Sequence, residues 1–253
     1  MTNPWQLYDD LIDALPADVR VTGCLVSHFS CIATDAGVGV AMVDEGGPRA
    51  SWPEREVVGR DLRTVAAFAK SWDLELASIG VAAMNSWFNT ESRVRQHRLV
   101  SFGTGCFQLH ADAVAGRRVA VVGHFGGFDR LAAASDLVVL EREPRETDLP
   151  DSACEYVLPD RDDVFLTGVT LTNKTMPRLL ELASGARVVL VGPTAPFAPE
   201  VYGDRVAGIS GGWVSDDDTC WQMAGAGARM RDMKEVLIRY NAVFDGAFGE
   251  EER

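Results

Sequence analysis

The chain has 253 residues, 37 acidic against 24 basic, and a formal net charge of −13 at pH 7. Hydrophobic residues make up 47% and charged residues 24% of it, values that fit a packed globular protein and exclude a mostly disordered or collagen-like chain. Binding to nucleic acid needs a cluster of basic side chains that neutralises phosphates, and no stretch supplies one. Nucleic acid and anionic membranes are therefore not expected as partners.

The N-terminal residues lack the basic stretch and apolar core of a secretory signal, and the longest apolar runs are as short as strands. We therefore expect a cytoplasmic protein without a membrane span. The five cysteines are odd in number, widely spread and form no CxxC pair, which predicts reduced thiols. Cys24, His28 and Cys31 resemble a metal cluster in composition, but their spacing crosses two predicted strands and lacks a fourth ligand, which disfavours zinc.

The first hundred residues predict a small α+β unit. Apolar residues at helical spacing predict a first helix, which Pro16 closes. Two apolar runs and a turn at residues 35–37 predict strands that end in a hairpin, and two alanine-rich helices follow. The expected order is helix, three strands and two helices, over residues 4–15, 20–26, 30–34, 38–43, 61–71 and 74–88.

From about residue 115 the pattern changes to short Val/Ile/Leu runs that alternate with helical segments. Such continuous runs are typical of a parallel sheet whose two faces are both covered by helices. The second unit is therefore predicted as a doubly wound, Rossmann-like and mostly parallel sheet, so that the fold class is α/β. We expect a boundary within residues 89–116 and two domains, 1–100 and 101–253. The predicted strands are residues 119–122, 137–140, 164–167, 188–191 and 206–209.

Ligands of such sheets bind beyond the carboxyl ends of the strands. The segments that follow the first four predicted strands should therefore meet in one crevice. Gly123 and Gly192 open two of these segments, and Glu141 follows the second strand. An acid there is typical of a dinucleotide site, but the GxGxxG turn that would accompany it is not present.

The segment TGVTLTNKT after the third strand is rich in short hydrogen-bonding side chains. Thr and Asn residues ahead of a helix that begins near Pro177 are ordinary capping residues, and capping explains one or two of these side chains. It does not account for so many hydroxyl groups beside Lys174, one of three lysines in the chain. We therefore expect a ligand-facing segment, with Lys174 holding an anion. The residues expected to bind the ligand here are Thr167, Gly168, Thr170 and Asn173.

His124 directly follows a predicted strand at a glycine turn. A single histidine is often structural, but this position suits a metal ligand or a base, and both interpretations remain open. Asn85 lies near the end of the helix predicted over residues 74–88. Small residues in that helix allow close packing, and Asn85 is a candidate for facing the second unit.

Several strings together resemble a family described as "putative heavy-metal chelation", of unknown function. They are SIGVAAMN, VVGHF, LEREPRETDLPDSACEYVLPDRD, TGVTLTNKTMPRLLELA and VGPTAP, between residues 23 and 216. The resemblance implies a domain similar to the enolase N-terminal domain, packed on a Rossmann-like domain with the active site between them. Beyond Asp216 no string matches, and we expect Met223, Met230 and Met233 to be packing residues.

The positions that match the family strings include Asn85, His124, Glu141, Asp148 and Lys174. His124, Glu141 and Asp148 would supply a mixed nitrogen and oxygen set, which suits a divalent cation or a metal chelate. Asp148 has a second interpretation, because it precedes a predicted helix that it would cap.

Two functions are compatible with these residues. The first is binding or processing of a metal ion or a small metal-chelating metabolite between the two domains. The alternative is an enzyme for a small polar metabolite with a nucleotide-type cofactor, in which Lys174 holds an anion and His124 transfers a proton. Residues 141–163 carry nine acids and three arginines, and this local charge favours a cationic or metal-bearing ligand. The cofactor stays open, with a divalent or heavy metal ion as candidate, and a homo-oligomer is compatible with the sequence.

Overall fold

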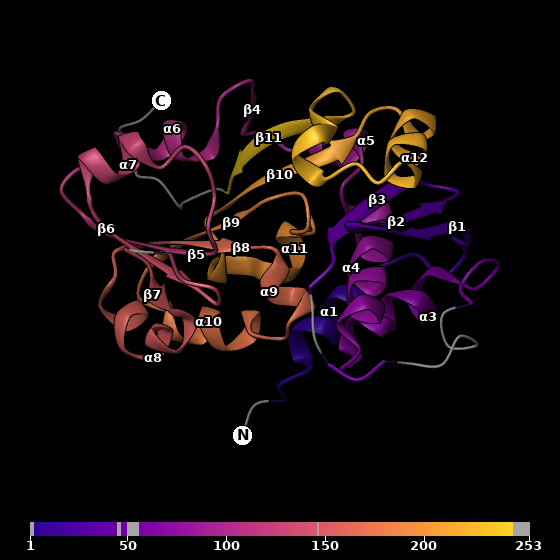
Figure 1. Ribbon diagram of the computed structural model, residues 1–253, viewed down its shortest axis with the longest axis horizontal. Helices are drawn as coiled ribbons and strands as arrows, with labels where there is room; N and C mark the ends of the chain where they lie inside the picture. The colour runs from indigo at the N-terminus through magenta and orange to yellow at the C-terminus, as the bar shows by residue number, and fades with distance from the viewer. Residues whose placement is uncertain (1–2, 45–46, 50–55, 146, 245–253) are drawn as a thin grey trace.

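Two β-sheets form the framework of the protein (Figure 1). This computed structural model describes residues 3–44, 47–49, 56–145 and 147–244. The smaller sheet is antiparallel, with the order β1-β2-β3, and the larger has the order β4-β11-β10-β9-β8-β5-β6-β7. The strands from β7 to β10 run parallel, whereas β11 runs antiparallel to both β10 and β4. The predicted α/β class with a mostly parallel sheet is confirmed.

The first unit follows the predicted order of elements. Its helix α4 is almost completely buried, and it packs on β2 and β3 of the small sheet and on α3 and η1. Asp73 caps this helix, because its carboxylate accepts the backbone N–H groups of Glu75 and Leu76. The elements are α1 (Gln6–Asp13), β1 (Val21–Val26), β2 (Phe29–Thr34), β3 (Gly37–Met42), α3 (Leu62–Ala66), the 3₁₀ helix η1 (Ala67–Lys70) and α4 (Leu74–Phe88).

Glycines on both sides let α4 approach its neighbours at backbone distance. A Cβ atom on Gly39 of β3 would lie 2.1 Å from the backbone nitrogen of Ser86, and one on Gly80 of α4 would lie 2.1 Å from that of Ala69. No side chain fits in either place, since carbon and backbone atoms do not approach so closely. The small residues of α4 therefore serve close packing, as the sequence suggested.

The second unit contains the predicted parallel strands, but several elements differ from expectation. Residues 169–172, expected in a loop, form a helical turn, and β10 begins at Gly208 and extends to Val214. The expected boundary segment contributes β4 to the large sheet. The elements are α5 (Glu91–Gln96), β4 (Val100–Phe102), α6 (Cys106–His110), β5 (Arg118–Val122), α7 (Asp129–Ala134), β6 (Asp136–Glu141), β7 (Leu149–Pro150), η2 (Asp151–Ala153), α8 (Cys154–Val157), η3 (Leu158–Asp160), β8 (Asp163–Thr167), α9 (Val169–Thr172), α10 (Met176–Leu182), β9 (Arg187–Val191), α11 (Pro199–Tyr202), η4 (Gly203–Arg205) and β10 (Gly208–Val214).

Both faces of the large sheet are buried. In β5, Val119 and Val121 pack on one face with Phe107 and Leu131, whereas Ala120 belongs to the core on the other face. This explains why the parallel strands appear in the sequence as continuous apolar runs. Among the helices of the described ranges, none is both long and apolar enough to cross a membrane.

The C-terminal segment returns to the first unit. Helix α12 (Asp217–Gly225) lies beside the small sheet in Figure 1, and the 3₁₀ helix η5 (Met230–Glu235) leads from it into β11 (Leu237–Val243). Their side chains form a core with Phe29 and Val40 of the small sheet. Met233 is 1% exposed in this core, and Met223 and Met230 pack against it. The expectation that these methionines are packing residues is confirmed.

We expect Gly39→Ala to lower the free energy of unfolding by about 3 kcal/mol, because the new methyl group would push β3 away from α4. Urea denaturation of the purified variant measures this change. Gly185→Ala is the matched control, since a Cβ atom there meets nothing within 4 Å, and it should stay within about 0.5 kcal/mol of the parent. Equal stability of the two variants would contradict the packing described for α4.

Candidate functional site

The carboxyl ends of β5 and β8 lie side by side, at the point where the strand order reverses. Gly123 follows β5 with a φ of +102°, and a Cβ atom there would lie 3.0 Å from Cβ of Thr167. Gly192 follows β9 with a φ of +97°, and the Phe125 ring lies near both glycines. Such a reversal point is where open α/β sheets bind ligands, and the glycines let the chain turn there without a side chain in the way.

His124 lies at this edge and is held by two acidic side chains. Its backbone N–H donates to Oε2 of Glu141 at 2.6 Å, and its ring atom Nδ1 lies 3.0 Å from Oδ2 of Asp148. The side chain of Asp148 is 2% exposed and that of His124 is 24% exposed. The structure therefore brings together the three residues that the sequence suggested as metal ligands, from three separate segments of the chain.

The two carboxylates are already engaged in hydrogen bonds. Glu141 also accepts the N–H of Arg142 at 2.8 Å, and Asp148 also accepts the N–H of Arg145 at 3.1 Å. The alternative interpretation of Asp148 as a helix cap is wrong, because the following helix η2 has no side-chain cap. Within the described residues, no three His, Cys, Asp or Glu side chains form a group that could hold a metal ion.

A carboxylate that accepts a hydrogen bond from Nδ1 places the imidazole proton on that atom. We assign this tautomer from the partner, Asp148. The other ring nitrogen, Nε2, then carries a lone pair, and no described residue makes a hydrogen bond with it. His124 thus presents one oriented nitrogen donor at the edge of the sheet, the arrangement found in carboxylate–histidine–metal triads.

The residues after β8 make hydrogen bonds within their own segment. Thr170 is buried and donates to the carbonyl of Thr167 at 2.6 Å, and Asn173 accepts from the hydroxyl of Thr175 at 2.6 Å. Gly168 allows a close backbone contact, because a Cβ atom there would lie 2.3 Å from the nitrogen of Ala195. In this structure Thr170 and Asn173 therefore stabilise local turns, and the half-buried Thr167 remains at the edge.

Lys174 has a φ of +70°, unusual for a residue with a side chain. Its ammonium group donates to the carbonyl of Thr172 at 2.7 Å and lies 5.9 Å from the centre of the Trp72 ring. Burial lowers the pKa of Lys174 to about 8, although Asp44 and Asp73 oppose this shift. A strained, half-buried lysine between the two units is a feature that functional sites often carry.

The segment after β3 brings the first unit to the same edge. Asp44 forms an ion pair with Arg142 at 2.5 Å, and the N–H of Met42 donates to the hydroxyl of Thr194 at 3.0 Å. Sequence reasoning placed Arg142 and Thr194 in the crevice loops but did not select them, and it missed Asp44. No local pattern marks these residues, because their partners lie about 100 or more residues away in the sequence.

Two asparagines at the end of α4 hold residues 193–197. Asn85 donates to the carbonyls of Val40 and Thr194 at 2.9 and 3.1 Å, so it faces the second unit. Asn89 donates to the carbonyl of Ala195 at 3.0 Å and accepts the N–H of Phe197 at 2.7 Å. Oδ1 of Asn85 is buried and has no hydrogen-bond partner among the described residues. This atom lies at the junction of the units.

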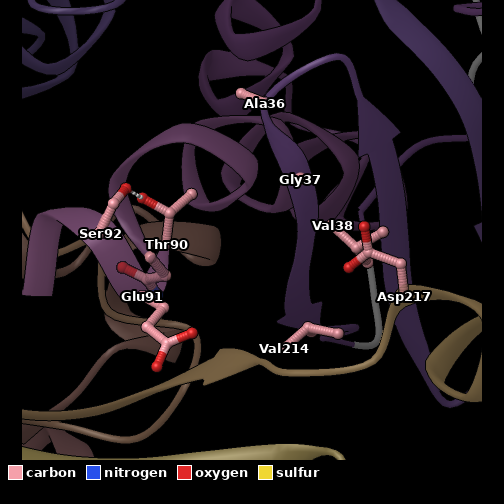
Figure 2. Close-up of a pocket in the computed structure, with 9 residues that line it drawn as sticks. Ala36, Gly37, Val38, Thr90, Glu91, Ser92, Val214 and Asp217 are labelled. Atoms are coloured by element: carbon pink, nitrogen blue, oxygen red, sulfur yellow. Dashed lines mark hydrogen bonds between the residues drawn. The ribbon is translucent and has the colours of Figure 1, made fainter.

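A surface pocket of about 520 Å³ lies elsewhere, beside the turn between β2 and β3 (Figure 2). Figure 2 shows Thr90 hydrogen-bonded to Ser92 on one side of it, with Asp217 on another. Its charged lining residues, Glu91 and Asp217, are both acidic, and none of the predicted site residues lines it. We therefore identify the candidate site from the side chains at the strand ends and not from this surface pocket.

Lys174 should titrate with a pKa near 8, and ¹³C-detected NMR of the labelled chain can measure this because the chain has three lysines. Since the unfolded chain keeps this proton up to the ordinary lysine pKa of 10.5, the free energy of unfolding should rise as the pH increases from about 8 towards 10.5. Asp44→Asn should lower the pKa of Lys174 further. The Lys174→Arg variant assigns the signal, and an unshifted pKa would contradict the burial of this amine.

Each of the two units matches a known protein family. The family described as "Putative heavy-metal chelation" (DUF364) matches residues 106–243, and a second family with the same description (DUF4213) matches residues 8–88. An uncharacterized protein of Methanocaldococcus jannaschii is 30% identical over 156 residues, which are 57% of each chain. The chain thus spans somewhat more than half the length of this curated relative.

Two crystal structures of DUF364 proteins of unknown function are similar to this one. The protein from Desulfitobacterium hafniense aligns with a TM-score of 0.88 and 31% identity, over 96% of this chain and 100% of that chain. The protein from Pyrococcus horikoshii aligns with a TM-score of 0.81 and 18% identity, over 95% and 99%. At 18% identity, the similarity to the Pyrococcus horikoshii protein shows a common fold only.

Proposed function

The chain belongs to the DUF364 family, described as "Putative heavy-metal chelation", and from this premise we propose that it binds a metal ion held in a small chelating molecule. In this proposal the ligand lies at the carboxyl edge of the large sheet, and His124 supplies the one metal ligand that the chain contributes. The observation that carries the proposal is the contact of 3.0 Å between Nδ1 of His124 and Asp148, which leaves Nε2 as an oriented donor.

The donor set favours a chelated metal over a bare ion. A bare divalent or transition-metal ion needs several protein ligands, and the described residues offer no group of three. Both oxygens of Glu141 accept backbone N–H groups, so we assign Glu141 and Asp148 to positioning His124. A metal whose other ligands come from a small molecule needs only one or two from the protein. His124 meets that need.

Charge and hydrogen-bonding groups at the junction of the two units fit such a ligand. Small chelators commonly carry carboxylates, and the ammonium group of Lys174 is the cation that would pair with them. The acidic segment from Glu141 onward favours the positive charge of the metal. The buried Oδ1 atom of Asn85 lacks a partner among the described residues and would accept a hydrogen bond from a bound water.

The test uses Co²⁺ alone and the Co²⁺ complex of nitrilotriacetate as probes, with the tag-free protein in a calorimeter. We expect the complex to bind more tightly than the bare ion. His124→Ala should abolish binding of the complex, and Asp148→Asn should weaken it by about 10- to 100-fold, because the imidazole loses its orienting partner.

His28→Ala is the matched control, since His28 is an exposed histidine away from the strand ends, and it should bind like the parent. If His124→Ala binds the cobalt complex as tightly as the parent does, the proposal is wrong. A change in the visible spectrum of Co²⁺ provides a second measurement, because it reports a nitrogen ligand entering the coordination sphere.

The pair of His124 and Asp148 also supports the alternative function, an enzyme that abstracts a proton from a small polar metabolite. An imidazole oriented by a carboxylate is the usual form of a general base. A nucleotide cofactor is less well supported, because Glu141, which would bind its ribose, already accepts two backbone N–H groups. A thermal shift of the metal-free protein with NAD or ATP, lost in Glu141→Ala, would favour this alternative.

A further inference from the structure

A group of sulfur atoms outside the site around His124 lies in the core between the small sheet and α12. This core contains two fully buried cysteines, Cys31 of β2 and Cys220 of α12, each 0% exposed. They come from segments 189 residues apart in sequence and meet where the C-terminal segment packs on the first unit (Figure 1). Neither residue belongs to the site around His124.

Cys31 and Cys220 lie in one core, on two elements that pack against each other. The interaction between their thiols lowers the pKa of Cys220 and raises that of Cys31. Two sulfur atoms therefore face each other across this core. The thiolate form, which is the ligand form, is more accessible to Cys220 than to a thiol buried alone, such as Cys154.

Strand register determines which cysteines share this core. Cys31 is opposite Leu25 in β1, whereas Cys24 is opposite Ile32. Residues directly opposite each other point to the same face of a sheet, and neighbours along a strand alternate. Cys24 therefore points to the other face, where it packs with Ile32 in the main core. The cluster of Cys24, His28 and Cys31, which the sequence already disfavoured as a zinc site, does not form, and Cys31 shares its core with Cys220.

The number of thiols and their apolar surroundings determine which metal ion fits this site. Zn²⁺ requires about four ligands, and the described residues provide no group of three His, Cys, Asp or Glu side chains. Thiolates prefer soft ions, and among these Hg²⁺ is satisfied by two thiolates in a line. The surroundings are apolar, formed by residues such as Phe29, Val40 and Met233. An uncompensated charge is costly there, which favours a dication that two thiolates neutralise over a monocation that leaves one negative charge.

We propose that Cys31 and Cys220 form a separate site for one two-coordinate thiophilic dication, of which Hg²⁺ is the type. Two S–H bonds break, two S–Hg bonds form, and two protons leave to solvent, so that no electrons are transferred. The product is a neutral bis-thiolate that joins β2 to α12. Because both thiols are fully buried, the ion enters when α12 opens locally from the sheet.

The test is retention of Hg²⁺ by the reduced, tag-free chain against a large excess of a monothiol, 2-mercaptoethanol. A preorganised pair should hold the ion about 100-fold more tightly than single thiols do. We expect one Hg²⁺ per chain after desalting, with ultraviolet sulfur-to-mercury absorption and release of two protons. Cys31→Ala and Cys220→Ala should each lose this retention.

Two controls match these variants. Cys154→Ala removes a buried thiol outside this core, and Cys24→Ala removes the thiol on the opposite face; both should retain the ion. His124→Ala should retain it as well, which separates this site from the one at the strand ends. Retention in the Cys31 and Cys220 variants, or loss in the Cys24 and Cys154 variants, would overturn the proposal.

If the core variants fail to fold, a measurement on the parent chain tests the proposal instead. With Hg²⁺ bound, Cys31 and Cys220 should be protected from alkylation in mild urea, whereas the other three cysteines should react. X-ray absorption should show two sulfur neighbours at one distance. Protection of a different pair, or failure of the freshly reduced chain to hold the ion, would also overturn the proposal.

Discussion

The arrangement of the whole molecule depends on the hydrogen bonds between α4 and residues 193–197. Asn85 and Asn89 donate to backbone carbonyls of this segment, and Asn89 also accepts the N–H of Phe197. These groups are buried, so each would cost free energy if its partner were absent. They fix the first unit against the end of β9, and thereby place β3 and Asp44 at the carboxyl edge of the large sheet, beside Arg142.

At that edge the chain uses its acidic side chains to orient one histidine. Glu141 holds the backbone of His124, and Asp148 holds its ring. Carboxylates used in this way determine where the remaining ring nitrogen points. This division of roles explains how three residues can match a metal-binding pattern in sequence although no three His, Cys, Asp or Glu side chains of the described residues form a group that could hold a metal ion. The pair of Cys31 and Cys220 differs in kind, because it is buried among apolar side chains and forms where the C-terminal segment packs on the small sheet.

Much of the fold could be predicted because it is encoded locally. The apolar runs of β5, β8 and β9 have the length and continuity of strands buried on both faces. The capping residue Asp73 and the small residues of α4 mark a helix that packs closely. The segment after β8 was harder to predict, because the hydroxyl of Thr170 suits a ligand and a helical turn equally well. Only its bond to the carbonyl of Thr167 distinguishes the two.

The sequence by itself determined the α/β class, the order of elements in the first unit and the main parallel strands of the second, since these depend on local periodicity. It also placed His124, Glu141 and Asp148 after predicted strands, where ligands bind. The tertiary structure alone decided which side chains meet: Asp44 with Arg142, and Cys31 with Cys220. It also decided that the C-terminal segment covers the small sheet. Pairing between distant segments depends on how helices and sheets pack, and no short stretch of sequence contains that information.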